Sequence, residues 1–151
     1  MAFSLNLANI ADAIAAISIS GVTVKDKDQI AASWVSTPNV LYPNPDGWVT
    51  DFRLEYQAIP RGAAAPVNVF YTLNYRFLGV QVGDMATLPV SYSDLVSKVI
   101  AIINAVVAVH APYDGGVNLE VQGVDLGPMT DPADNQYYGA DLAFSVEEIQ
   151  N

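Results

Sequence analysis

The chain has 151 residues and a formal net charge of −10, from 16 acidic against 6 basic side chains. It is 52% hydrophobic and 15% charged, with one histidine and no cysteine. This composition predicts a single globular domain over residues 1–151, argues against a surface that grips nucleic acid by its phosphates, and leaves no thiols for a disulfide framework or a zinc knuckle.

The chain begins with a predicted amphipathic helix over residues 4–17. The apolar stripe of this helix consists of Leu7, Ile10, Ile14 and Ile17. Gly21 can end the helix, and residues 22–24 form a short strand candidate. Because the opening residues lack the basic stretch of a secretion signal, we expect no signal peptide and synthesis in a cytoplasm.

Residues 29–48 show no regular period and are predicted to form an irregular arm. Prolines and tight-turn residues interrupt this segment, and only residues 40–42 suggest a brief strand. Two interpretations stay open. The segment is either a surface loop whose Trp side chains tuck into the core, or an arm that reaches a neighbouring subunit.

Two long runs then alternate apolar and polar residues, which predicts antiparallel strands over residues 49–59 and 67–77, each with one packed face. The apolar face of the first strand comprises Phe52, Leu54, Tyr56 and Ala58. That of the second comprises Val67, Val69, Tyr71, Leu73, Tyr75 and Phe77. Residues 60–66 are expected to form a hairpin tip, and residues 78–90 a connector.

The most apolar segment predicts a long central helix over residues 91–110. Ser91, with Asp94 three residues further on, is expected to cap its first turn. One face of the helix comprises Leu95, Val99, Ile102, Val106 and Val109, and a second face comprises Val96, Ile100, Ile103 and Val107. Such a helix is either nearly buried or shared between subunits, and it is too short and too interrupted to read as a membrane span.

Two further alternating strands are predicted over residues 117–122 and 140–147, with a long acidic loop over residues 127–138 between them. The predicted fold is therefore a two-layer α+β domain. It consists of an antiparallel sheet of about four main strands, with the long central helix and the N-terminal helix packed on one face.

The sequence offers no catalytic, cofactor or metal site. The single histidine, His110, lies at the end of the central helix, where the helix dipole favours an imidazolium. A catalytic pairing with Asp114 would need a serine nucleophile, and no nucleophile elbow or phosphate loop is present. Asp131 and Asp134 could hold a hard cation, but they lack the spacing of an EF-hand, so we expect a solvated loop.

The side chains from which a function can be inferred are acidic or aromatic. The polar face of the sheet carries five acidic candidates, Asp51, Glu55, Glu120, Asp141 and Glu147, against Arg53 and Arg76. Aromatic residues bury much area at low entropic cost while keeping a polar group, so those in irregular segments are candidates for a subunit interface. These interface candidates are Trp34, Tyr42, Trp48, Tyr113, Tyr137 and Tyr138.

The order of the elements resembles that of the tail terminator proteins of long-tailed bacteriophages. Those proteins have a similar layout of an N-terminal helix, two long strands, a central apolar helix and two closing strands. The likeness covers most of the chain. Its most suggestive part is the closing run over residues 117–150, in which the aromatic–glycine pair Tyr138-Gly139 introduces the last strand.

This resemblance implies a structural protein of the virion that forms a homo-oligomeric, hexameric ring. The ring would lie at the head-proximal end of the tail, bind the tail tube protein on one side and the neck or connector protein on the other, and pass DNA through an acidic bore without specific binding or any membrane contact. The arm 29–48 and the loop 127–138 would serve the subunit contacts. The alternatives are another neck or tube component, such as a stopper or a tube subunit, or a monomeric ligand-binding module.

Overall fold

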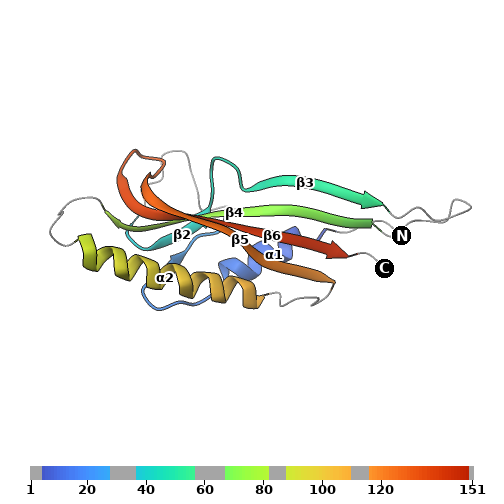
Figure 1. Ribbon diagram of the computed structural model, residues 1–151, viewed down its shortest axis with the longest axis horizontal. Coiled ribbons are helices and arrows are strands. Elements are labelled where there is room, and N and C mark those ends of the chain that lie inside the picture. Colours follow the sequence, from blue (N-terminus) through green and yellow to red (C-terminus); the bar gives the residue numbers. More distant parts are fainter. Residues whose placement is uncertain (1–4, 28–36, 57–66, 82–87, 110–115, 150–151) are drawn as a thin grey trace, which may run out of the picture.

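The computed structural model describes residues 5–27, 37–56, 67–81, 88–109 and 116–149. Two helices lie against a twisted six-stranded sheet (Figure 1). In chain order the elements are α1 (Leu7–Ala15), β1 (Thr23–Val24), β2 (Val40–Pro43), β3 (Val49–Tyr56), β4 (Val67–Gln81), α2 (Leu88–Val109), β5 (Val117–Thr130) and β6 (Gln136–Ile149). The predicted mixed α+β class is confirmed, with six strands in place of about four main ones.

The longest strand, β4, lies at the centre of the sheet. On one side it pairs antiparallel with β6, which in turn pairs antiparallel with β5. On its other side, β4 pairs first with β3 and further along with β2, and the short β1 lies parallel to β2. Among the described elements, β5 and β3 are therefore long strands with one neighbour each, and they lie at opposite edges of the sheet.

The alternation in β4 and β6 buries one face of the sheet, as predicted. The buried side chains of β4 include Val69, Tyr71, Leu73, Tyr75 and Phe77, and those of β6 include Ala140, Leu142, Phe144 and Val146. These residues form one core with Ile10 and Ile14 of α1 and with Leu95, Val99, Ile102 and Val106 of α2. Both helices thus cover the same face of the sheet, because their apolar stripes need a broad apolar partner.

The predicted boundaries of the central helix and of the segment before it are wrong. β4 continues to Gln81, so residues 78–81 of the expected connector are strand. Helix α2 begins at Leu88, so Ser91 lies inside it and does not cap it. Pro89 obscured this start in the sequence, yet proline is tolerated in a first helical turn because the N–H that it lacks would have no partner there.

The acidic loop predicted over residues 127–138 is mostly a hairpin. Strand β5 runs to Thr130 and β6 starts at Gln136, and the two residues are paired. The carboxylate of Asp131 accepts hydrogen bonds from the backbone N–H groups of Ala133 and Asn135, at 3.0 and 2.8 Å. Asp131 is buried, so the expectation of a solvated loop is wrong for this residue. Its carboxylate shapes the turn.

Within the arm predicted over residues 29–48, the brief strand suggested over residues 40–42 is confirmed as β2. Strand β2 is buried along its whole length, between β1 and β4. Trp48 is partly buried and packs against the core, as the loop interpretation expected of the Trp side chains. Trp34 lies outside the described residues, as do the hairpin tip 60–66, His110, Tyr113 and Asp114.

Strand β3 lies at the edge of the described sheet, and part of its apolar face is exposed, although Val49 packs against the core. Phe52 and Leu54 were predicted to be buried, but their side chains are 51% and 47% exposed. A register shift between Thr50 and Arg53, with Asp51 at a φ of 54°, bends the strand at this point. The helices lie under the centre and the opposite side of the sheet, away from β3 (Figure 1).

A buried carboxylate near the end of β6 holds the start of α1. Glu148 is only 1% exposed, and one of its oxygens accepts hydrogen bonds from the backbone N–H and the side-chain amide of Asn6, at 2.8 and 2.9 Å. The hydroxyl of Tyr71 donates to the other oxygen at 2.5 Å. A negative charge at the first turn also suits the dipole of α1, so Glu148 substitutes for the side-chain cap that this helix lacks.

We predict that Glu148→Ala lowers the free energy of unfolding by about 1–3 kcal/mol, because it leaves the Tyr71 hydroxyl and the Asn6 amide without an acceptor. The matched control is Glu147→Ala, which removes the neighbouring carboxylate from the opposite face and should cost less than about 0.5 kcal/mol. Urea denaturation followed by circular dichroism measures both. Equal losses for the two variants would contradict this role of Glu148.

The buried tyrosines make the fold sensitive to alkali. Burial raises the pKa of Tyr75 to about 12, and burial also raises the pKa of Tyr42 to about 12 although Arg76 partly offsets it. An unfolded chain ionises these hydroxyls near pH 10, so the stabilisation is complete below about pH 10 and is lost as the pH rises toward 12.

The expected loss is about 1.4 kcal/mol for each buried tyrosine by about pH 11. Denaturation at a series of pH values measures it, and Tyr75→Phe should make the profile less steep. A free energy of unfolding that stays constant from neutral pH to about pH 11 would refute this explanation.

Candidate functional site

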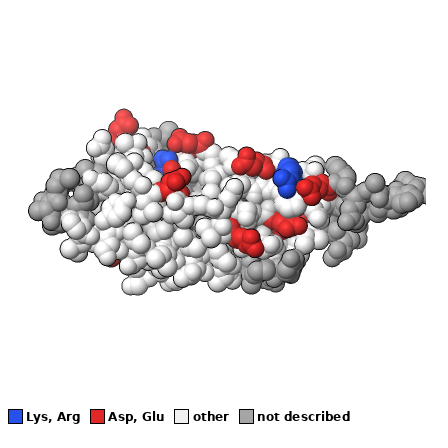
Figure 2. All heavy atoms as spheres, viewed as in Figure 1, with Lys and Arg blue, Asp and Glu red and all other residues white. Residues whose placement is uncertain are grey.

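The face of the sheet that no described helix covers is polar and acidic. The strand register places Arg76 beside Asp141, and Asp141 beside Asp125 of β5. Acidic side chains are spread along this face (Figure 2). Its charged members are Asp46, Asp51, Glu55, Glu120, Asp125, Asp141 and Glu147, with Arg53 and Arg76. Seven acids against two arginines leave a formal charge of −5.

All five acidic residues singled out from the sequence lie on this face. Asp51, Glu55 and Glu120 are exposed, whereas Asp141 and Glu147 are half-buried between neighbouring strands. The sequence missed Asp46, which lies in the turn after β2, and Asp125, which lay beyond the predicted end of its strand. A longer window of strict alternation would have placed Asp125 on the apolar side with Val117 and Val121, because the bulge between Val121 and Gly123 shifts the period of β5. That this face lines a bore stays a prediction.

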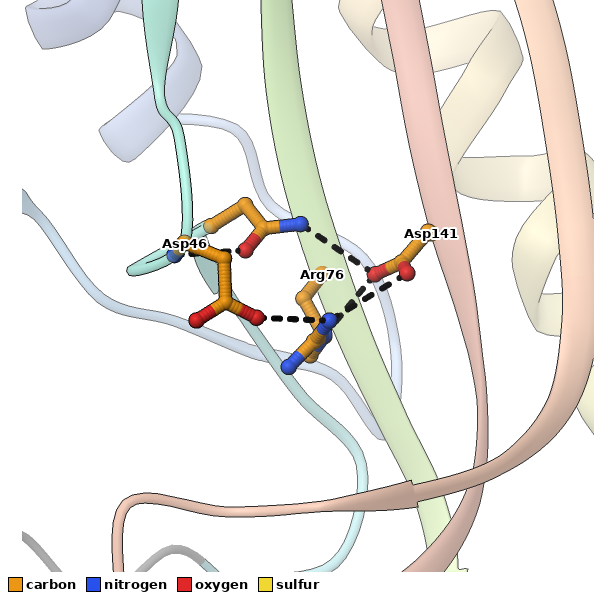
Figure 3. A network of polar contacts seen from close by, with 4 residues as sticks. Asp46, Arg76 and Asp141 are labelled. Carbon is orange, nitrogen blue, oxygen red and sulfur yellow. Dashed lines mark hydrogen bonds and ion pairs between the residues drawn. The ribbon is translucent and has the colours of Figure 1, made fainter.

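An arginine-centred network holds one end of this face (Figure 3). Nε of Arg76 donates to Oδ1 of Asp141 at 2.8 Å, and Nη2 donates to Oδ2 at 3.2 Å. The same Nη2 lies 3.5 Å from Oδ2 of Asp46. The side chain of Arg76 is only 14% exposed, and its hydrogen bonds to Asp141 raise the pKa of Arg76 above its usual value. Such a two-pronged pair is geometrically specific.

The network also fastens the turn between β2 and β3. The side-chain oxygen of Asn44 accepts from the backbone N–H of Asp46 at 2.9 Å, and its amide donates to Asp141 at 3.4 Å. The two acids around one arginine leave this cluster negative. The arrangement therefore stabilises local structure while it keeps the face acidic.

Two hollows open on this face. One, of about 450 Å³, lies beside Arg76 and is lined by Asp46, Asp141, Gln136 and residues 128–130. The other, of about 390 Å³, lies beside Arg53, whose guanidinium stacks 4.4 Å above the ring of Phe70 and pairs with Glu55 at 3.3 Å. Among the residues that the structure describes, no group of three His, Cys, Asp or Glu side chains could hold a metal ion.

The aromatic interface candidates divide into two groups. Tyr42 and Tyr137 are 0% and 2% exposed and pack in a small core cluster, so their rings cannot touch a neighbouring subunit while this fold is intact. Tyr138 is partly buried, and its ring meets the exposed ring of Tyr92 edge-on at 6.4 Å. Trp48 is partly buried against the main core.

The clearest apolar surface lies elsewhere, on the outer side of α2. Tyr92, Val96 and Ile100 follow one another at four-residue spacing and are 37%, 37% and 53% exposed. Val96 and Ile100 belong to the second face predicted for this helix and are exposed, whereas Ile103 and Val107 of the same predicted face pack against the core. The expectation that the central helix is too short and too interrupted to read as a membrane span is wrong by length and composition, because residues 89–109 are long and apolar enough to cross a membrane, with a mean hydropathy of 1.7. Core helices can pass the same test. An ion pair between Asp94 and Lys98 lies on this helix.

We predict that Arg76→Met lowers the free energy of unfolding by about 1–3 kcal/mol, because it leaves the half-buried Asp141 without its main partner. The control is Arg53→Met on the same face. Arg53 is 61% exposed, so its loss should cost less than about 1 kcal/mol. Urea denaturation compares the two variants, and a larger loss for the Arg53 variant would contradict the structural role of Arg76.

Comparison of the sequence with known proteins identified no relative. No protein-family model and no curated protein sequence matches the chain. What the protein does must therefore be inferred from the charges and the uncovered apolar side chains of its own surfaces.

Proposed function

We propose that the chain is a structural subunit of a bacteriophage tail, which forms a ring at the head-proximal end and works as a tail terminator. The observation that carries the proposal is the pair of unlike surfaces on one small domain. One is the acidic sheet face, and the other is the uncovered apolar side of α2. In a ring the first would face the bore and the second would face protein.

The acidic face suits a bore that DNA must pass. Repulsion between exposed charges is screened beyond about 8 Å at physiological ionic strength, so an acidic wall acts only on DNA that comes close to it. The formal charge of −5 from each subunit would be multiplied around a closed ring. Phosphates would then be kept from the wall, and DNA would pass without specific binding.

The other role of the ring would be to bind a different protein at each of its two ends. One end would bind the tail tube protein and stop its polymerisation, and the other would bind the neck or connector protein. Each subunit would be made in the host cytoplasm, and the ring would become part of the virion. We propose a hexamer, and no bond is made or broken in this function.

The alternatives predict different particles. A tube subunit would polymerise into filaments, and a stopper would belong to the neck without ending a tube. A monomeric module for a small apolar ligand would need an apolar cavity under the sheet. The two hollows on the polar face are lined mainly by charged and polar side chains, so they do not favour this last candidate.

Light scattering and negative-stain microscopy of the purified protein, alone and mixed with tail tubes, test the assembly. We expect rings that cap tubes at one end. A stable monomer at every concentration would overturn the proposal, and long filaments would favour a tube subunit.

The electrostatic part has its own test. We predict that rings of Asp51→Lys/Glu120→Lys/Glu147→Lys retain DNA on a filter at low salt and release it as salt rises, because phosphate contacts are salt-dependent. Wild-type rings should retain none. Rings of Asp12→Lys, which changes an exposed charge on α1, are the control and should behave as wild type. DNA retention by the wild type would refute a repelling bore.

A further inference from the structure

Strand β3 is interrupted in its middle and consists of two halves. The first half, residues 49–50, and the second half, residues 53–56, pair with β4 in registers that differ by one residue. Asp51 lies between the halves at a φ of 54°, a left-handed conformation that residues with a side chain adopt at a cost. The two halves are therefore separate units on the same edge of the sheet.

The first half of β3 is anchored to the core and to β4. Val49 and the preceding Trp48 pack against the core. The backbone N–H of Asn74 donates to the carbonyl oxygen of Trp48 at 2.8 Å, and its side-chain amide donates to the hydroxyl of Thr50, also at 2.8 Å. These contacts hold the strand in place up to Thr50.

The second half of β3 lies on β4 with its side chains largely in solvent. Residues 53–55 are exposed, and the guanidinium that stacks on Phe70 belongs to Arg53, which is 61% exposed. Phe52 stacks on Tyr71 at 5.7 Å and is itself 51% exposed. Segments with few buried apolar contacts and solvent-exposed backbone hydrogen bonds open at a small fraction of the free energy of global unfolding.

We propose that residues 52–56 form a flap that is hinged at Asp51 and opens from β4 while the rest of the fold stays intact. Opening breaks the pairing of one half-strand and uncovers the ring of Tyr71, which is 2% exposed when the flap is closed. It also leaves residues 67–70 of β4 as a free edge, to which a strand of another chain can be added. The flap goes beyond the proposed ring function and does not depend on it.

Hydrogen exchange measured by NMR at a series of low urea concentrations tests the flap. The β4 amides among residues 68–70 that bond to β3 should exchange about 100-fold faster than the amide of Asn74, because opening needs no global unfolding. Their rates should barely change with urea, since opening exposes little surface. Equal rates and an equal urea dependence would mean that β3 separates only when the sheet unfolds, and would overturn the proposal.

Removal of the ring of Phe52 should favour the open flap. Phe52→Ala should raise the exchange rate of the flap-facing β4 amides by about 2- to 10-fold, the change expected for the loss of an aromatic pair. Tyr92→Ala is the matched control, because it removes an exposed ring on α2 that meets Tyr138, and it should leave these rates unchanged. An equal rise in both variants, or no rise in either, would overturn the flap.

Disulfides can test the hinge, because the chain has no cysteine that would compete. Glu55→Cys/Asn68→Cys links paired residues of the second half, and Thr50→Cys/Thr72→Cys links paired residues of the first half. Oxidation of the second-half pair should slow exchange of the flap-facing amides about tenfold relative to its reduced form, whereas oxidation of the first-half pair should leave it unchanged. Equal slowing by both disulfides would show that β3 opens as one unit, and would overturn the hinge at Asp51.

Discussion

The antiparallel pairing of β4 with β6 is the constraint on which the rest of the structure depends. The register holds from Asn68 opposite Ile149 to Gln81 opposite Tyr137, with one irregularity near Gly79. Because side chains alternate along both strands, this register builds the core and the acidic face at once. A slip of one residue would turn the acids toward the helices and the core residues toward water.

Polar contacts connect the central pair of strands, β4 and β6, to neighbouring elements. Glu148 joins β6 to the first turn of α1 across 142 residues of sequence, and Arg76 joins β4 to the turn that leads into β3. Each contact has one group with little access to solvent, the carboxylate of Glu148 and the side chain of Arg76, for which a missing partner is costly.

The helical layer is narrower than the sheet. Helices α1 and α2 cover the centre and part of β5, where Val117 and Leu119 are buried. Further out, Phe52 and Leu54 of β3 and Val121 and Leu126 of β5 stay exposed. An exposed apolar edge is unfavourable for an isolated domain, but it becomes useful when a second surface can cover it. The acidic face, in contrast, is favourably exposed to water. The domain therefore has one surface that favours contact with protein and one that favours contact with solvent.

The sequence by itself determined the inner faces of β4 and β6, the buried stripe of α2 and the shared face of the five acidic candidates. Burial of every second residue in a strand, or of residues about four apart in a helix, produces a regular period of apolar residues in the sequence. Only the tertiary structure decided where the strands end. Cross-strand pairing carries β5 and β6 through Gly127, Pro128 and Gly139, residues that locally favour turns. It also decided that β3 is an edge, with Phe52 exposed, that Tyr42 is buried, and that Glu148 meets Asn6. Each of these depends on contacts between distant segments, and no local pattern encodes them.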